Sequence, residues 1–515
     1  MSQRFRSFTA RLLPASSAAA KGIRPHVASL VTSDVFWLAC IGLLTLVVYG
    51  PILNDWFTKD DFFFLRAARF ASPPEYVKES FDFTGYDRHE RLIDFIRDQD
   101  IALPFLAYRP LYFLSLEGMY LVFGKHAEGY HAVSLLVHLT NVLLVWRIAT
   151  RLLGGKLAPR MAALIFAVHP TYVAAVAWIS DIATPLATFA ALLSLLFLMK
   201  SMDSARLHLG WYTGSLVSYA ASMFFHTETL SWVAVFVAFF LVAPAFRNSR
   251  LQANRWLFLL PFIAIALGSY RLHSWILAHT PANEQVYHIG PHMFTNFKNL
   301  ASLALFPVDD GETTAHFIAF VVLLLMMACL PLLAVLDKKR TAVPRTELFV
   351  LVWFLASLAP LLTPDGNIWF SNHAIARKLY VAGPALSIFL ALFGASLLRL
   401  SPMRLKRHVQ LLATVLLLAA LAASLVQAGD HREQVSTRAS EWERFVQALQ
   451  QTYPSLPKGS TLYIVGAPLQ LSFGEFHLVS AVQAFYGKVD VYAITEERAL
   501  ELERSLDDGD HIYRY

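Results

Sequence analysis

Two adjacent acids, Asp60 and Asp61, follow the first apolar run of membrane length, which ends near residue 50. Aromatic side chains surround the two acids in the segment 54–65. Carboxylates are costly to hold at a membrane surface, so this pair indicates chemistry at the lipid–water boundary rather than simple anchoring. The alternative is a solvated acid pair that only marks the outer boundary.

The elements that must position these acids are membrane helices. The chain has 515 residues, of which 56% are hydrophobic and 16% charged, and its mean hydropathy is +0.48. This composition is typical of a protein that crosses the membrane many times. Runs of about 17–25 apolar residues can cross a bilayer. Eleven such runs are predicted, near 34–50, 130–150, 161–179, 182–199, 210–226, 229–246, 256–276, 315–336, 346–363, 380–398 and 408–427.

The orientation follows from the basic residues, which gather in every second loop. They cluster in the N-terminal tail 1–33 and in the loops near 150, 200, 250, 340 and 400. The positive-inside rule then places the N-terminus in the cytoplasm, and an odd number of spans places the C-terminus outside. The net charge of +6 is explained by these loops and requires no nucleic-acid partner, whereas membrane lipids are expected partners. The first span is predicted to be a signal anchor.

The outer side is predicted to carry most of the polar mass. The first outer loop, 51–129, contains patterns typical of interfacial helices at 89–97 and 110–123. The C-terminal residues 430–515 read as a small α/β domain outside the membrane, because their polarity and periodicity suit a soluble unit. Its predicted elements are helices at 432–451, 475–485 and 495–506 and strands at 461–465, 489–494 and 511–515. The predicted fold class is therefore an all-α membrane domain over 34–429 with a small α/β domain.

Five segments in order along 30–400 carry a resemblance to a known family. They are Asp60-Asp61, 108–111 with 130–141, 169–180, 226–228 and 377–380. On these segments the chain resembles the GT-C superfamily of membrane glycosyltransferases, which take a sugar from a polyprenyl-phosphate carrier. The nearest group is the protein O-mannosyltransferase-like one and its bacterial relatives. The resemblance implies a membrane domain of about 11 transmembrane helices, a polyprenyl-phosphate sugar as donor and a glycan, lipid or protein as acceptor.

The reaction that the resemblance implies is attack of an acceptor hydroxyl on the anomeric carbon of the donor. A hydroxyl is a poor nucleophile near neutral pH, so a base must take its proton as the new bond forms. One carboxylate is sufficient for inversion, because phosphate is already a good leaving group. Asp60 is the predicted base. Asp61 would orient the acceptor or keep Asp60 ionised by sharing its donors, and the two acids could exchange these roles.

Arg377 and Lys378 stand at the outer end of the span near 380, at the depth expected for the donor phosphate. A guanidinium pairs with two phosphate oxygens at once and stabilises the departing phosphate. Arg377 is therefore the predicted main phosphate ligand, with Lys378 and Arg109 in support. The alternatives are an arginine that extends from a span end to the interface and, for Arg109, a salt bridge to the acids of the first loop.

Five further residues are candidates for substrate binding. They are His131, His169, Asp181, Glu228 and Tyr380. Packing inside the membrane domain is the alternative for the histidines and the favoured one for His138, and Glu228 is expected to pair with Arg377 or to act as a helix N-terminal charge. The chain also departs from the family pattern. It has Ala174 in place of a Glu, Thr227 in place of a Lys and Thr184 in place of an acid, for which Asp181 is a candidate substitute.

No metal site is predicted, because the spacing of His279, His288 and His292 fits no ligand motif. No cofactor is assigned, and dependence on a divalent cation stays open. Two rival functions are a flippase or transporter for a lipid-linked glycan and a non-catalytic subunit of a glycan pathway. Transporters tend to show repeats and charges near the membrane midplane, whereas here the charges lie toward the outer face. The favoured function is the enzyme, in a bacterial inner membrane.

Overall fold

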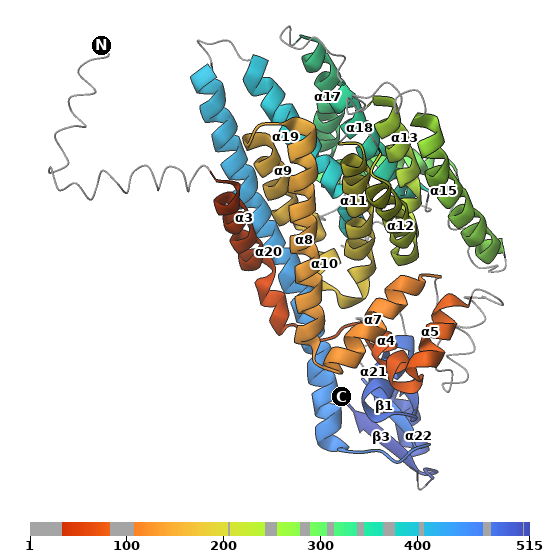
Figure 1. The fold of residues 1–515 in the computed structure, drawn as a ribbon. Coiled ribbons are helices and arrows are strands. Elements are labelled where there is room, and N and C mark those ends of the chain that lie inside the picture. Colours follow the sequence, from red (N-terminus) through yellow and green to blue (C-terminus); the bar gives the residue numbers. More distant parts are fainter. Residues whose placement is uncertain are drawn as a thin grey trace, which may run out of the picture.

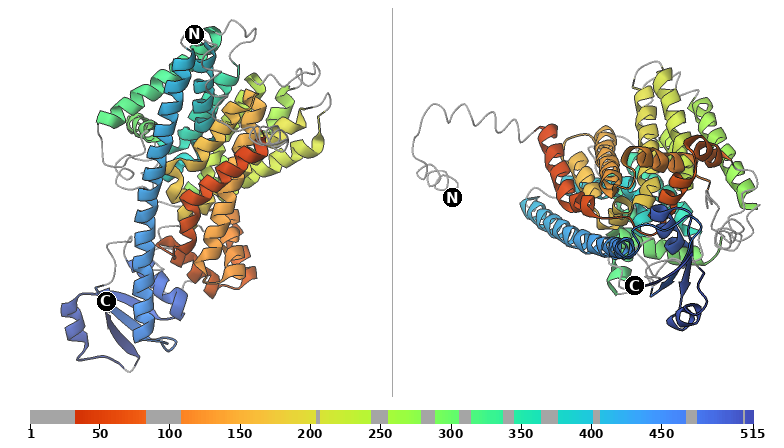
Figure 2. Two further views of the ribbon diagram at one scale, coloured as in Figure 1. Left: turned by 90° about the vertical axis from the view of Figure 1, so that its left-hand side faces the viewer. Right: turned by 90° about the horizontal axis from the view of Figure 1, so that it is seen from below.

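The computed structural model describes residues 33–82, 108–203, 207–242, 255–278, 289–305, 314–336, 345–363, 376–400, 406–466, 475–507 and 509–515. A bundle of long helices forms the upper part of the molecule in Figure 1, and a smaller group of short helices and strands forms the lower part. Helix α20 (Lys406–Thr452) runs along the bundle and continues into the lower part, as both Figure 1 and Figure 2 show.

Helices with buried inner faces make up the bundle, in which α8, α9, α11 and α19 are neighbours. Besides α20, the described helices of the bundle and the short 3-10 turns between them are, in chain order, α3 (Asp34–Tyr49), η1 (Gly50–Asn54), α8 (Ala127–Leu153), α9 (Leu157–Val168), η2 (Pro170–Tyr172), α10 (Val173–Ala177), η3 (Ile179–Ile182), α11 (Ala183–Ser201), α12 (Leu209–Phe225), η4 (Thr227–Ser231), α13 (Trp232–Val242), α15 (Arg255–Ala278), α16 (His292–Leu305), α17 (Thr314–Leu336), α18 (Arg345–Leu358), η6 (Ala359–Leu362), η8 (Ala376–Lys378) and α19 (Leu379–Leu400).

Seven helices of the described residues are long and apolar enough to cross a membrane. They are Asp34–Asn54, Ala127–Leu153, Ile179–Ser201, Trp256–Ile276, Thr314–Val335, Arg345–Leu362 and Leu379–Leu400. The pair Leu157–Val168 and Pro170–Ala177 would be an eighth span, bent by 48°. This bend lies at the predicted break, because Pro170 has no backbone N–H to continue helix α9. Shorter apolar helices occupy Pro110–Phe123 and Thr227–Leu241. The total of eleven spans stays a prediction.

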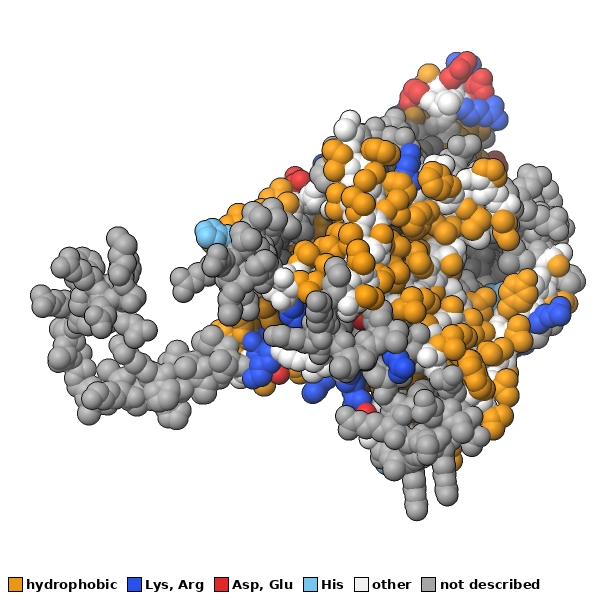
Figure 3. Space-filling view, turned by 90° about the horizontal axis from the view of Figure 1, so that it is seen from above, with side chains coloured by type: hydrophobic (Ala, Val, Ile, Leu, Met, Phe, Trp, Pro, Cys, Tyr) orange, Lys and Arg blue, Asp and Glu red, His pale blue; other side chains and the backbone are white. Residues whose placement is uncertain are grey.

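Apolar side chains cover the outside of the bundle. Figure 3, which views the molecule from above, shows hydrophobic side chains over much of the described surface on that side. Leu43 and Val47 on α3 and Leu325 and Val335 on α17 are each more than half exposed. So much exposed apolar surface suits contact with lipid rather than with water. The chain is therefore a multi-pass integral membrane protein.

The lower part joins two segments that are distant in the sequence. From the first predicted outer loop come α4 (Asp60–Phe70), α5 (Pro73–Phe81) and α7 (Pro110–Phe123), and from the C-terminal residues come α21 (Glu475–Tyr486), α22 (Glu496–Leu502) and strands β1 (Thr461–Val465), β2 (Asp490–Ile494) and β3 (Asp510–Arg514). The strands form a parallel sheet in the order β2-β1-β3, in which Thr461 is level with Asp490 and Asp510. Both segments contribute to one apolar core, and the extent of a separate C-terminal domain stays a prediction.

The connection between the bundle and the sheet differs from the predicted one. The predicted span at 408–427 and the predicted helix at 432–451 are parts of a single helix, α20. Gly429 lies at the predicted break, but a glycine inside a helix costs only about 1 kcal/mol and does not end it. The interfacial helix predicted at 89–97 and the histidines at 279 and 288 lie outside the described residues.

Candidate active site

The two acids lie in the first turn of helix α4, which begins at Asp60. Carboxylates are favoured there because the helix N-terminus carries a partial positive charge. The residue before them, Lys59, has a φ of 50° and a ψ of −120°, and in the described part of the chain it is the only non-glycine residue with a positive φ. Successive helix residues point in different directions. Asp60 and Asp61 therefore have different surroundings.

Asp61 is buried and holds two loops together. Its side chain is 3% exposed. One oxygen accepts a hydrogen bond from the backbone N–H of Thr58 at 2.8 Å, and the other accepts from the backbone N–H of Ser180 at 2.8 Å and from the Ser180 hydroxyl. Burial raises the pKa of Asp61 to about 7, although the hydrogen bonds from Ser180 and Thr58 act in the opposite direction.

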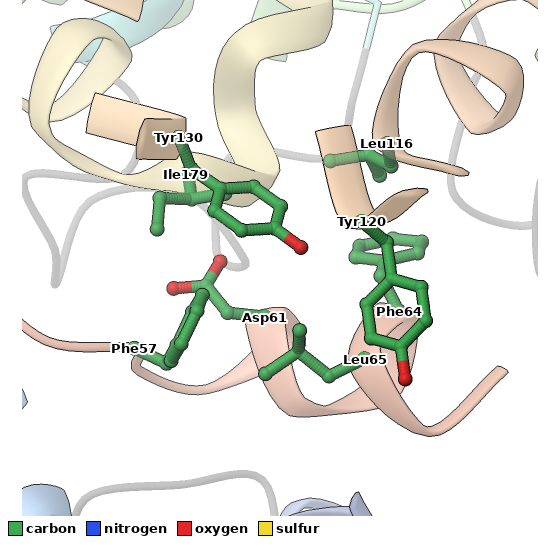
Figure 4. A pocket seen from close by; sticks show the side chains of 8 residues that line it. All are labelled: Phe57, Asp61, Phe64, Leu65, Leu116, Tyr120, Tyr130 and Ile179. Carbon is green, nitrogen blue, oxygen red and sulfur yellow. The ribbon is translucent and has the colours of Figure 1, made fainter. Parts of the chain in front are cut away.

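Asp61 also lines a small pocket. Its wall is formed mainly by apolar side chains of α4, α7, α8 and η3, with the Asp61 carboxyl group at one side (Figure 4). The lining residues are Phe57, Asp61, Phe64, Leu65, Leu116, Tyr120, Tyr130 and Ile179. Because both Asp61 oxygens already accept hydrogen bonds, the residue is placed to orient its surroundings. It shares no donor with Asp60 among the described residues, so this part of the sequence interpretation is wrong.

Asp60 is the more accessible of the two acids. Its side chain is 45% exposed, and its Oδ1 atom lies 2.7 Å from Nε2 of His477, a residue of helix α21. Burial acts to raise the pKa of Asp60, but the hydrogen bond from His477 and the positive charges of His477, Arg377 and Lys59 lower it, and the result is a pKa below the ordinary value. Asp60 is therefore ionised near neutral pH, as a general base must be.

Arg377 lies in the same region, although it belongs to η8. Its Cζ atom is 4.3 Å from the centroid of the Trp178 ring, and its Nε atom is 3.7 Å from Oδ2 of Asp181. The second distance is too long for a hydrogen bond. The ring and the ion pair orient the guanidinium, and among the described residues Arg377 donates no hydrogen bond. The ammonium group of Lys59 is 5.3 Å from the centroid of the same Trp178 ring.

Lys378 faces a different set of partners. Its Nζ atom lies 3.1 Å from Oε1 of Glu228 and 2.9 Å from Nε2 of His226, and the residue is only 6% exposed. The expected pairing of Glu228 with Arg377 is therefore wrong: Glu228 pairs with Lys378, and Asp181 pairs with Arg377. Neighbouring residues of a 3-10 turn point in different directions, so each basic side chain reaches its own acid.

Arg109 and Asp181 complete the cluster. Arg109 precedes helix α7 and is close enough for its charge to act on His226 and Lys378. No salt bridge joins Arg109 to the described acids of the first loop. Asp181 accepts a hydrogen bond from the Thr184 hydroxyl at 3.1 Å, so this carboxylate lies beside the position where the family pattern has an acid.

The remaining predicted site residues lie within the helix packing. His169 contacts the Thr171 hydroxyl at 2.8 Å and the Ala304 carbonyl at 3.1 Å through its two ring nitrogens. The Tyr380 hydroxyl lies 2.8 Å from Nδ1 of His138 and accepts a hydrogen bond from Asn141. His131 is buried beside the backbone of residues 55 and 56. The structure therefore does not bring His169 or Tyr380 into the ionic cluster, and His138 is a packing histidine, as predicted.

Four residues of the cluster were missed by the sequence interpretation: Lys59, Trp178, His226 and His477. Lys59, Trp178 and His226 lie inside segments that the interpretation used, close to residues that it did select. His477 has no such signal, because it lies in a helix predicted only as part of a C-terminal unit. In the described part of the chain, no group of three or more His, Cys, Asp or Glu residues could hold a metal ion.

Part of the chain is similar in sequence to known proteins. Residues 107–272 match the family model described as dolichyl-phosphate-mannose-protein mannosyltransferase. The chain is 32% identical over 161 residues to protein O-mannosyl-transferase Tmtc1 of Drosophila melanogaster and 35% identical over 133 residues to protein O-mannosyl-transferase TMTC2 of Mus musculus. These matches cover 30% and 25% of this chain, but only 17% and 16% of the two relatives.

One solved structure extends the similarity to most of the chain. It is the archaeal oligosaccharyltransferase AglB from Archaeoglobus fulgidus, with 13% sequence identity and a TM-score of 0.50 over 88% of this chain and 64% of AglB. At this identity the similarity concerns the fold. The apolar bundle and the smaller lower part are therefore arranged as in this membrane protein. Over residues 107–272 the chain is similar in sequence to protein mannosyltransferases, and over most of its length it shares the fold of AglB.

Proposed function

We propose that this chain transfers a sugar from a polyprenyl-phosphate donor to an acceptor hydroxyl, with Asp60 as the general base. One observation carries the proposal. The ionised carboxylate of Asp60 and the guanidinium of Arg377 lie in one cluster, and among the described residues the guanidinium donates no hydrogen bond. The reaction needs a base that takes the proton of the acceptor hydroxyl and a guanidinium group that binds two phosphate oxygens.

The donor phosphate would take the place beside Arg377. The Arg377 donors would bind two of its oxygens, and the positive charges of Lys59 and Arg109 would favour the anion from other sides. Lys378 would contribute mainly its charge, because Glu228 and His226 already contact its ammonium group. The proton of the acceptor hydroxyl would pass to Asp60 as the new C–O bond forms, and the polyprenyl phosphate would leave with the electron pair. This sequence inverts the anomeric centre.

The known proteins support the donor class. The similar fold of AglB has been observed in complex with a dolichol-phosphate and an inhibitory peptide, and Tmtc1 and TMTC2 are named protein O-mannosyl-transferases. A polyprenyl phosphate is therefore the proposed carrier, and a protein, a glycan or a lipid is the proposed acceptor. The basic loops favour a cytoplasmic N-terminus and a periplasmic C-terminal part, in a bacterial inner membrane.

The test is a transfer assay on the detergent-purified protein with a panel of radiolabelled polyprenyl-phosphate sugars. Wild type and Asp60→Asn are assayed side by side, since Asn keeps the shape of the side chain but cannot accept a proton from the hydroxyl. Label that the wild type alone moves from one donor supports both the class and the base. Equal transfer by both proteins contradicts the role of Asp60, and no turnover with any donor and acceptor fraction contradicts the proposed activity.

A further inference from the structure

The carboxylate of Asp60 receives a hydrogen bond from a residue 417 positions further along the chain. That residue, His477, lies in the first turn of helix α21, and its side chain is 3% exposed. The Nε2 atom is the one that contacts Asp60. Nε2–H is a donor in the imidazolium and in one neutral tautomer of histidine, so either form can make this contact.

The position of His477 is fixed by the packing of α21 against α4. Arg66 of α4 donates a hydrogen bond to the side-chain oxygen of Gln483, and Nη1 of Arg69 donates to the carbonyl of Ala484 at 2.8 Å. Phe63 and Phe476 bring their rings within 5.3 Å, centroid to centroid, beside the two site residues. The acid and the histidine thus belong to one packed pair of helices, and their separation does not depend on a flexible loop.

The two oxygens of Asp60 have different surroundings. Oδ1 is occupied by His477, whereas Oδ2 receives no hydrogen bond from the described residues. A carboxylate that is held through one oxygen and open at the other is oriented for a hydroxyl that approaches from the open side. The side chain of His477 is buried behind Asp60, so its action on the reaction is exerted through Asp60.

We propose that His477 is a positioning residue for the base: its Nε2–H holds Oδ1 of Asp60, so that Oδ2 faces the acceptor hydroxyl, and the C-terminal helix α21 is thereby part of the active site. This inference rests on the proposed function. In the transfer step the acceptor proton moves to Oδ2, the acceptor oxygen bonds to the anomeric carbon, and the phosphate departs. His477 remains a hydrogen-bond donor throughout.

The contact also predicts how the reaction depends on pH. The charged and titratable groups that act on or near Asp60 are Lys59, Asp61, Tyr112, Arg377 and His477. His477 is the one that combines a hydrogen bond with a charge, and it lowers the pKa of Asp60. Loss of the imidazole therefore raises the pKa of the base, and the acidic limb of the kcat/KM profile moves to higher pH.

The experiment compares His477→Ala and His477→Gln with wild type and with His511→Gln as a matched control. His511 is a half-buried histidine of strand β3 that packs on Tyr453, so its replacement alters a histidine of the same segment away from the cluster. The amide side chain introduced by His477→Gln would retain an N–H donor close to the position of Nε2 without a positive charge. Folding is monitored by the melting temperature and the elution profile of the purified proteins.

His477→Ala is expected to lower kcat by roughly 10- to 100-fold, with the KM for the donor little changed and the acidic limb displaced to higher pH. His477→Gln should recover part of kcat and displace the limb less than His477→Ala does, because it keeps the hydrogen bond to Asp60 but not the charge. His511→Gln should match wild type. A wild-type kcat and pH profile in both folded His477 variants would overturn the inference while leaving the proposed function intact. Failure of the proposed function appears separately, as absence of transfer by the wild type.

Discussion

The carboxylate of Asp61 and residue Ser180 connect the start of helix α4 to the turn that follows Trp178. Asp61 accepts hydrogen bonds from both the backbone N–H and the hydroxyl of Ser180. From the other side, the Tyr112 hydroxyl donates a hydrogen bond to the Ser180 carbonyl at 2.6 Å. Asp60, which precedes Asp61, and Asp181, which follows Ser180, are thus placed by one shared junction. The second acid of the pair therefore fixes the position of the first one.

This junction predicts a dependence of stability on pH. The pKa of folded Asp61 is raised from 3.8 to about 7. Between these values the unfolded state has released the proton that the folded state retains, so the free energy of unfolding falls as the pH rises. The slope is at most about 1.4 kcal/mol per pH unit, and the effect is complete above pH 7. The Asp61→Asn variant has no carboxyl group at this position, so its free energy of unfolding lacks this dependence on pH.

The measurement is the melting temperature of wild type and Asp61→Asn in one detergent between pH 4 and pH 8. The stability of wild type relative to the variant should decline up to about pH 7 and then remain constant. Other titrating groups are common to both proteins and cancel in the difference. Parallel curves over the whole range would show that Asp61 has an ordinary pKa in the folded protein.

Arg377→Ala is expected to reduce transfer by roughly 100- to 1,000-fold while the protein remains folded, because the phosphate loses its bidentate partner. Arg377→Lys keeps the charge but not the planar fork, so its activity should be intermediate. Transfer is measured at several donor concentrations to separate donor affinity from turnover. Arg160→Ala is the control, because it removes another arginine paired with an acid, Asp34, at 2.8 Å. Unchanged donor affinity and turnover in Arg377→Ala would exclude it as the phosphate ligand.

Lys59 combines an unusual backbone conformation with a positive charge. Two substitutions distinguish the effect of the conformation on stability from the effect of the charge on activity. At a φ of 50° and a ψ of −120° a β-carbon is strained, whereas glycine is not. Lys59→Gly should therefore be more stable than Lys59→Ala by about 1 kcal/mol. Both variants lack the ammonium group near Trp178 and should transfer less sugar than wild type. Equal melting temperatures would show that the backbone is relaxed, and full activity would remove Lys59 from the site.

Gly383 marks a close contact between α19 and the turn η2. A β-carbon at this position would overlap the Tyr172 hydroxyl and lie 3.1 Å from the Phe166 ring. Gly383→Ala should therefore lower the stability by about 1–3 kcal/mol. Gly394 of the same helix has open space around it, so Gly394→Ala should change the stability by less than about 1 kcal/mol. The melting temperatures of the two variants are compared. Equal melting temperatures would mean that α19 and η2 move apart without loss of stability.

The sequence analysis selected Asp60 and Arg377 as candidates because charged residues beside membrane spans are costly and therefore conspicuous. The structure brings the two residues into one region, and their roles stay predictions. The sequence analysis could not assign the partners of Arg377 and Lys378, since which of two adjacent side chains faces which acid depends on the turn that carries them. It predicted the break after Val168 from Pro170, because the lack of a backbone N–H is a local property. The continuity of α20 was missed because a change from apolar to polar residues resembles a domain boundary, although a helix can continue through it.

His477 was beyond reach of the sequence for a different reason. Its contact with Asp60 depends on how α21 packs against α4, and neither helix carries a local pattern that names the other. The ammonium group of Lys59 likewise lies near the ring of Trp178 because the hydrogen bonds between Asp61 and Ser180 join their loops. Long-range pairs of this kind are properties of the packed structure, whereas helix ends and span positions follow from residues close together in the chain.

The pairing of Asp60 with His477 has a consequence for how the protein is made. Ribosomes synthesise a chain from its N-terminus, so Asp60 leaves the ribosome early and waits for its partner while the intervening helices enter the membrane. Until α21 has been translated and has docked on α4, the carboxylate of Asp60 in a nascent chain lacks its hydrogen bond from His477. The proposed active site would therefore be completed late in biogenesis, after the bundle is inserted, and a chain that ends before α21 would be inserted without it.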